Sequence, residues 1–371
     1  PLAVQLKVAK DNGWNVQILS DQIQEDPIAA GEQRELGPFR MVVVNAQRDE
    51  LTLALEVQED GRPNDRLLDN LDPPAATTTF ENDRLMFSAT DDGLFGFTNV
   101  DFAYRQGVGF NWKEREWLLS PSGFIFSEGA SRVLKAFDPD RVPSEFVVRK
   151  ALTGAERNRG VFTDEGIGDR EIGVDIHHRY IFPTQSSSST IILLEITNRS
   201  LETLHDVAGG FYFDWDLGYA GENNTTEPAP NALPTTFKEL GIAQQFKRSG
   251  IDAVVVCAAV SNEAVIAPQA AGMLLSDIVD DGDGLTDADV IRLLSSNGSI
   301  QTDRSGDVCG FLGMRFPGDL LPNARKSFMI VITVAATEEE AQELTKQAIL
   351  STGLEEGEER RRELRVWPNP V

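Results

Sequence analysis

The sequence predicts an all-β protein made of antiparallel β-sandwich modules with few short helices. Three observations predict this fold class. Short apolar runs of strand length follow one another along the chain, turns containing Ser, Asn or Gly separate them, and convincing helical patterns are few. This rhythm is typical of an antiparallel meander rather than of βαβ units. With 371 residues the chain is long enough for two or three modules.

Residues 1–72 are predicted to form a small β-rich module, immunoglobulin-like or built from hairpins. Apolar and polar residues alternate over residues 4–8 and 16–18, on both sides of Asp11-Asn12-Gly13, whose composition is typical of a hairpin turn. We therefore expect these two strands to pair with each other. Two further strand-like runs lie between Phe39 and Gln58, again around a polar turn.

Three further segments complete the predicted domain organisation. Residues 73–90 include a stretch rich in Pro, Thr and Asp, which is typical of a linker or loop. Residues 91–355 contain a long succession of short strands and are predicted to form one large β-sandwich module. Residues 356–371 are expected to be a charged linker that leads into the start of a truncated sorting domain.

Two segments carry the signals of a helix start. Thr337 and Glu340 have the spacing of a capping box, and apolar residues recur on one face of the sequence that follows, up to Leu350. Thr286 and Asp289 have the same spacing in front of the apolar run VIRLLSS. We therefore expect a helix after each capping box.

Composition and charge narrow the range of functions. The chain has 34 Lys and Arg against 59 Asp and Glu, a formal net charge of -25, which repels phosphate backbones and argues against a nucleic-acid partner. No apolar run is long enough to cross a bilayer. Cys257 and Cys309 lack the spacing of zinc or thiol-redox motifs, so that a disulfide and two separate buried thiols both remain open.

The acidic stretch DGDGLTDAD is the best candidate for a calcium loop. If Asp283 is aligned with the Asp-Gly step of an EF-type loop, Asp281 and Asp287 also fall at ligand positions. Val279 and Val290 stand where the first and twelfth ligands are required. Two interpretations therefore remain open: the three aspartates bind calcium, or the stretch is a purely structural acidic turn that caps the following helix.

A second candidate site lies in the run FYFDWDLG. In a strand, Asp214 and Asp216 share the face opposite to the aromatic residues, and two carboxylates on one face are suited to bind calcium. With Glu195, which lies within a hairpin's reach, they are also candidates for the acid and base of a glycosidase. The alternative is an acidic strand end whose carboxylates accept hydrogen bonds from neighbouring turns.

The histidines and the familiar catalytic motifs offer less. His177 and His178 are adjacent, so in a strand they point to opposite faces and cannot easily ligate one metal ion. With His205 they are the whole histidine supply. The sequence contains no G-x-S-x-G elbow, no phosphate-binding glycine loop and no H-E-x-x-H motif. The sequence leaves catalysis undecided and favours a non-catalytic role.

Several stretches of the sequence resemble a known family. LEITN, FDWDLG and GVGFNW, together with the closing run RFPGDLLPNARKSFMIVITV and its helix, resemble a β-rich C-terminal region of exported bacterial proteins. That region often follows a subtilisin-like serine peptidase domain and precedes a C-terminal sorting domain. The run VWPNP at the end of this sequence resembles the start of such a sorting domain. The likeness covers about residues 91–371. The peptidase's G-T-S-x-A motif is absent, so the resemblance implies that a catalytic domain would lie before Pro1 and carries no catalytic residue over.

These observations favour a secreted or cell-surface accessory, adhesion or assembly region of a larger exported protein, with calcium as its candidate cofactor. A protein or a surface polymer is the expected partner, beside an upstream peptidase domain of the same polypeptide. Two alternatives remain open: the non-catalytic part of a subtilisin-like peptidase, and a carbohydrate-active or carbohydrate-binding sandwich that uses Asp214, Asp216 and Glu195.

Overall fold

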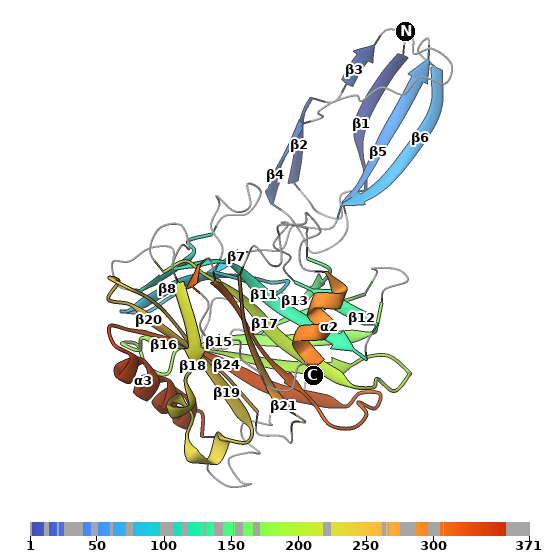
Figure 1. Cartoon of the computed structure of the whole chain (residues 1–371). Helices are drawn as coiled ribbons and strands as arrows, with labels where there is room; N and C mark the ends of the chain where they lie inside the picture. Colours follow the sequence, from blue (N-terminus) through green and yellow to red (C-terminus); the bar gives the residue numbers. More distant parts are fainter. Residues whose placement is uncertain are drawn as a thin grey trace. The chain divides into compact units, whose positions relative to one another are not determined.

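The structure is a computed structural model of the chain, which divides into two compact units, Pro1–Pro74 and Ala75–Val371 (Figure 1). Each unit is described by itself. The described residues are 2–10, 15–20, 22–25, 40–45, 51–59, 62–71, 77–96, 107–112, 118–129, 131–136, 144–150, 152, 159–165, 171–217, 224–261, 265, 267–274, 286–295, 305–306 and 308–353. Every strand pair in these residues is antiparallel, which confirms the predicted all-β class.

The first unit contains two small sheets. One has the strand order β3-β1-β5-β6 and the other pairs β2 with β4. Their bounds are β1 Leu2–Lys10, β2 Asn15–Ser20, β3 Gln22–Glu25, β4 Arg40–Asn45, β5 Leu51–Glu59 and β6 Arg62–Leu71.

The predicted pairing of the first two strands is wrong, although both strands form. β1 pairs with β3 and β5, and β2 pairs with β4. The ladder between β1 and β5 runs from Leu2 opposite Glu59 to Lys10 opposite Thr52, and so spans the whole of β1. The other edge of β1 is occupied by β3, which has four residues and is shorter than the six-residue β2. Neither turn chemistry nor strand length alone therefore decided the partner.

The second unit is a sandwich of two large antiparallel sheets. The first sheet has the order β10-β8-β9-β11-β17-β23-β21, with β7 paired to β8 and β12 to β11. Its strands are β7 Thr77–Glu81, β8 Leu85–Thr90, β9 Leu94–Phe95, β10 Phe110–Trp112, β11 Leu119–Glu128, β12 Arg132–Lys135, β17 Val207–Trp215, β21 Ala267–Leu274 and β23 Val308–Arg315.

The second sheet has the order β13-β14-β15-β16-β24-β20-β19-β18-β22. Its strands are β13 Val147–Lys150, β14 Gly160–Thr163, β15 Val174–Ile181, β16 Ser189–Asn198, β18 Asn224–Pro228, β19 Gly241–Arg248, β20 Val254–Val260, β22 Ser305–Gly306 and β24 Arg325–Ala335. The described helical segments are α2 Asp287–Ser295, α3 Glu338–Ser351, and the 3-10 turns η2 Pro230–Ala232 and η3 Thr235–Phe237.

Residues 73–90 do not form the expected linker. β7 and β8 lie within them and pair with each other, and β8 also pairs with β9 and β10 in the first sheet. The segment combines β-branched threonines with Phe80, Leu85 and Phe87, whose side chains are buried in the core. The apolar residues of this segment outweighed its turn-forming ones.

Aromatic side chains from both sheets fill the space between them. Along β15 buried and partly exposed residues alternate, as expected for a strand with one face on a core. Aromatic contacts join the sheets directly; among them are Phe95 with Tyr180 at 5.9 Å between ring centroids, Phe124 with Phe162 at 5.6 Å, and Trp215 with Phe246 at 6.0 Å. The core between the sheets is thus rich in aromatic side chains, whose packing holds the two sheets together.

Each outer face of the sandwich carries a helix (Figure 1). α2 packs on the first sheet over β11, β12, β17, β21 and β23, and α3 packs on the second sheet over β16, β20 and β24. Both predicted N-caps form, since the Thr286 and Thr337 hydroxyls accept hydrogen bonds from the backbone N–H groups of Asp289 and Glu340. The Asp289 carboxylate accepts from the Thr286 N–H and completes the capping box, whereas the Glu340 carboxylate accepts from the Ala336 N–H. Among the described helices, none is long and apolar enough to span a bilayer.

Candidate functional site

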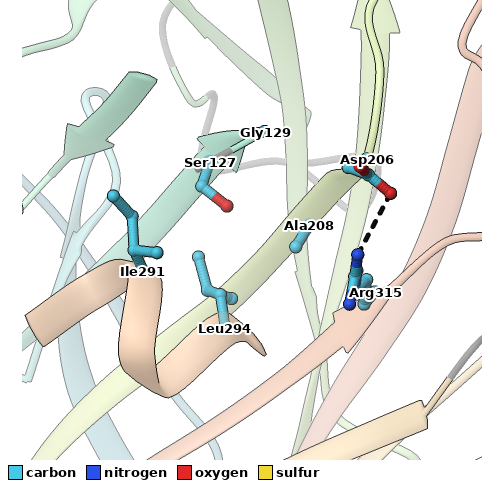
Figure 2. A pocket seen from close by; sticks show the side chains of 7 residues that line it. All are labelled: Ser127, Gly129, Asp206, Ala208, Ile291, Leu294 and Arg315. Carbon is cyan, nitrogen blue, oxygen red and sulfur yellow. Dashed lines mark hydrogen bonds and ion pairs between the residues drawn. The ribbon is translucent and has the colours of Figure 1, made fainter. Parts of the chain in front are cut away.

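A small cavity opens between α2 and the outer face of the first sheet (Figure 2). Its volume is about 90 Å³. The sheet, the turns beside it and the helix all contribute to its lining: Ser127, Gly129, Asp206, Ala208, Ile291, Leu294 and Arg315. These residues come from four segments that are far apart in the sequence, so the cavity is a product of tertiary packing.

The cavity exists because β17 has small residues on its outer face. Ala208 and Gly210 alternate with the core-facing residues of this strand, and neither fills the space under a helix. The ring of Phe311 covers Gly210 and its partner Gly313, where an added Cβ would lie 2.5 Å and 2.7 Å from the Phe311 Cζ atom. Ala208 lies beyond this ring, and the cavity opens beside it.

The walls of the cavity differ in polarity. Ile291 and Leu294 of α2 form an apolar wall, with Ala208 as part of the floor. At the opposite side the Nη2 atom of Arg315 lies 3.1 Å from the Oδ1 atom of Asp206, an ion pair drawn as a dashed line in Figure 2. Ser127 is 3 % exposed, and its hydroxyl points toward the cavity in the same view. The site therefore offers a short apolar slot beside a guanidinium and a hydroxyl.

The position of α2 depends on local sequence. The Thr286 and Asp289 capping box begins the helix, and acidic residues in its first turn are favourable there because the N-terminus of a helix carries partial positive charge. Val290, Leu293 and Leu294 are buried against the sheet. The spacing of the apolar residues thus fixes which side of the helix faces the cavity.

The predicted calcium loop is described in part. Asp281 and Asp283 lie outside the described residues, while Asp287 is the first residue of α2. An Asp287 carboxylate oxygen lies 3.7 Å from the Lys135 Nζ atom of β12, and the Asp287 side chain is 47 % exposed. Within the described part of the chain, no group of three or more His, Cys, Asp or Glu side chains is arranged to hold a metal ion. Calcium at these aspartates stays a prediction.

Asp214 and Asp216 lie at the end of β17. The side chains that flank Asp214, Phe213 and Trp215, are in the core, so Asp214 points to the outer face, as the alternation predicted. Asp214 is nevertheless only 9 % exposed, and its Cα partner across the ladder is Cys309 of β23. Asp216 follows the strand and donates its backbone N–H to the Leu118 carbonyl.

Glu195 does not join these aspartates. It lies on β16 of the second sheet between Leu194 and Ile196, which are both in the core, so its carboxylate points to the outer face of that sheet. Asp214 points to the outer face of the first sheet, and the aromatic core lies between the two carboxylates. The alternative in which Glu195 and Asp214 form one site is not what the structure has, because the two strands belong to opposite sheets.

Glu195 instead belongs to a charged cluster with Arg159, His177 and Arg325. One of its oxygens lies 3.6 Å from the Arg159 Nη2 atom and 3.1 Å from the Arg325 Nη1 atom. The Arg159 guanidinium also lies 2.6 Å from the Nδ1 atom of His177, to which it donates. Burial, and then the positive charge of Arg159, lower the pKa of His177 to about 3. This imidazole is therefore neutral at physiological pH.

His178 points to the other side of β15, as predicted for adjacent histidines. It is fully buried, and burial lowers its pKa to about 3. Its ring packs edge-on against Phe162, and its Nδ1 atom lies 3.4 Å from the Tyr180 hydroxyl oxygen. His205, by contrast, is exposed, and a hydrogen bond to Asp319 raises its pKa. The three histidines thus lie in three different environments.

The two cysteines are free, buried and separate. Cys257 lies in the core between the sheets, where burial raises the pKa of its thiol well above the usual value. Cys309 lies on the outer face of the first sheet with the residues beneath α2. Of the two alternatives that the sequence left open, the structure has the separate thiols.

Sequence reasoning missed the cavity residues. Ser127, Asp206 and Arg315 are single polar residues at strand ends, and such residues are common on any sheet. One signal was present: the run Ala208-Gly209-Gly210 inside a strand pattern marks a place where a larger group approaches the backbone closely. The position of α2 above this run, which completes the cavity, is a tertiary contact.

The fold and its surfaces define the chain's second unit as a two-sheet antiparallel β-sandwich with one helix on each outer face. Neither the known protein families nor the curated proteins contain a match to this chain.

Three solved structures illustrate the weak likenesses that this chain shows. "Putative kojibiose phosphorylase from human microbiome" is 10% identical over 76% of this chain and 33% of its own, with a TM-score of 0.39. A galactose mutarotase related enzyme from Lactobacillus acidophilus is 10% identical over 70% of this chain and 98% of its own, with a TM-score of 0.36. A polysaccharide lyase is 11% identical over 75% of this chain and 35% of its own, with a TM-score of 0.34. This chain spans about a third of the first and third proteins. At these TM-scores we base neither fold nor function on the likeness.

Proposed function

We propose that the chain is a non-catalytic β-sandwich region of a larger secreted or cell-surface protein, where it serves as an accessory, adhesion or assembly module. The observation that carries this proposal is the placement of Glu195 and Asp214 on opposite outer faces of the sandwich. A glycosidase needs its two carboxylates within about 10 Å on either side of one bond. These two have an aromatic core between them.

The surroundings of both carboxylates support a structural role. The Glu195 carboxylate forms an ion pair with the Arg325 guanidinium at 3.1 Å, and Glu195 is 6 % exposed. Both observations suit a group that stabilises the outer face of the sheet. Asp214 is nearly buried beside the layer that α2 covers. The strands that carry the resemblance to exported proteins, LEITN in β16 and FDWDLG at the end of β17, run through the middle of the two sheets. They are framework residues of the proposed module.

Turnover assays test the non-catalytic role. The full chain is incubated with a panel of polysaccharides and with casein, beside Glu195→Gln and Asp214→Asn variants as matched controls. We expect no hydrolysis above buffer from any of the three proteins. Hydrolysis by the parent chain that either variant lacks would overturn the proposal and restore the carbohydrate-active alternative or a proteolytic one.

Cell fractionation tests the exported context. An antibody against the chain should detect the native gene product in the medium or on the surface of intact cells, and external protease should remove the surface signal. Detection of the product exclusively inside intact, protease-treated cells contradicts this part of the proposal.

A further inference from the structure

The cavity beneath α2 has the size of a small organic group. A buried cavity of about 150 Å³ accommodates a benzene molecule, which has six carbon atoms. The 90 Å³ found here therefore corresponds to about three or four carbon atoms. Ile291, Leu294 and Ala208 give this space an apolar lining, so that an alkyl chain gains free energy on leaving water for it.

The polar side of the cavity favours an anion over a cation. The Arg315 side chain is 29 % exposed, and that of its partner Asp206 is 60 % exposed. The less exposed charge is screened less by water, so a new partner for Arg315 gains more than a new partner for Asp206. A guanidinium has five N–H donors, and the contact with Asp206 engages the Nη2 atom. Donors therefore remain for a second carboxylate.

Ser127 adds a second donor to the same place. Its side chain is 3 % exposed, and the hydroxyl points toward the cavity from β11, while Arg315 reaches it from β23 (Figure 2). A hydroxyl donor and a guanidinium on two sides of one space are suited to the two oxygens of a carboxylate. The apolar wall of α2 lies on the third side, where the rest of such a ligand would lie.

We propose that this cavity binds a short-chain aliphatic carboxylate, with its alkyl chain between Leu294 and Ala208 and its carboxylate on Arg315 and Ser127. This inference goes beyond the accessory role and does not depend on it. A sandwich module that binds a small carboxylate can do so whether or not it belongs to an exported protein.

Ligand-detected NMR titration of the full chain with butanoate tests the proposal. Butylamine has a similar chain and the opposite charge, and acetate has the charge without the chain. We expect saturable binding of butanoate and at least about tenfold weaker binding of the other two, because each lacks one of the two contacts. Butylamine that binds as tightly as butanoate, or butanoate that does not saturate, overturns the proposal.

Variants of the lining locate the binding. Arg315→Gln should weaken butanoate binding about tenfold or more, and Ala208→Val should abolish it because its added methyl groups occupy the floor. Arg325→Gln is the matched control, since Arg325 is also a partly exposed, ion-paired arginine but lies on the second sheet. The affinity of this variant for butanoate should equal that of the parent. Should Ala208→Val fail to fold, Ser127→Ala tests the same space with less volume change and should weaken binding several-fold. Equal affinities in the parent and the Arg315→Gln variant contradict the assignment.

Discussion

The two outer faces of the sandwich both carry a helix, but the sheets beneath the helices differ. Under α3 the second sheet presents bulky side chains such as Met329 and Val331, against which Ile349 of the helix is fully buried. Under α2 the first sheet also presents bulky side chains such as Tyr212 and Phe311, but Ala208 is small, and a cavity of about 90 Å³ remains beside it. The difference shows that an apolar helix face fills a layer only where the sheet supplies complementary volume.

The two sheets differ in their charges as well. The second sheet carries His177 with Arg159, Glu195 and Arg325 on its outer face and His178 on its inner face. Both imidazoles are held neutral by their surroundings. The second sheet is therefore the acid-sensitive half of the sandwich, and the first sheet contains the cavity.

Acid should have the largest effect, and it should act through the second sheet. Burial lowers the pKa of His178 from 6.5 to about 3, so the unfolded chain takes up a proton first as the pH falls. Stability is then retained above about pH 6.5 and lost progressively down to about pH 3, by up to roughly 5 kcal/mol for this residue. Urea unfolding at a series of pH values between 7 and 4 measures the loss.

Two variants distinguish His178 from other acid-sensitive groups. His178→Asn should flatten the dependence of unfolding free energy on pH, whatever its effect at pH 7. His205→Asn is the control, because His205 is exposed and its pKa is raised rather than lowered. An unchanged slope in the His178→Asn variant would show that the buried imidazole is not responsible.

Truncation of one buried side chain in each helix should have the next largest effect on the free energy of unfolding. Ile349→Ala removes a fully buried side chain from the layer under α3 and should cost toward the upper end of about 2–5 kcal/mol. Leu294→Ala enlarges a space that is already hollow and should cost toward the lower end of that range. Chemical denaturation of both variants compares the layers. Equal costs would mean that α2 is packed as tightly as α3.

Calcium should have the smallest effect. We propose that Asp281, Asp283 and Asp287, with Asp214 and Asp216 as a second candidate pair, bind calcium that stabilises the fold. At free calcium a few times the dissociation constant, the gain is about 1 kcal/mol, or about 2 °C in melting temperature. Thermal melting with calcium and with EGTA measures it. A melting temperature that EGTA leaves unchanged contradicts both sites, and Asp281→Asn with Asp283→Asn separates them.

Much of the fold was predictable from local sequence. The strands appear where apolar residues alternate, and Asp214 faces away from the core as the alternation around Phe213 and Trp215 required. Both N-caps, at Thr286 and at Thr337, form as their three-residue spacing to Asp289 and Glu340 predicted. These features depend on neighbours within a few residues, and such interactions can be read from the sequence.

Strand partners and the candidate site could not be predicted in this way. The turn chemistry at Asp11-Asn12-Gly13 suggested that the first two strands pair, yet β1 pairs with β3 and β5. The sequence left open whether Glu195 lies near Asp214, and their strands lie in opposite sheets. The ladder partner of a strand depends on how its two faces fit the rest of the fold, including segments far away in the chain.

The sequence by itself determined that the chain is all-β, where many of its strands and two capped helices begin, and which faces of those strands meet the core. These follow from alternation and from capping, which are interactions over short sequence distances. The tertiary structure alone decided which outer face each carboxylate occupies, that Cys257 and Cys309 are separate, and that Ala208, Leu294 and Arg315 enclose a common space. They depend on which sheet a strand joins and on what packs above it, and no local pattern specifies either.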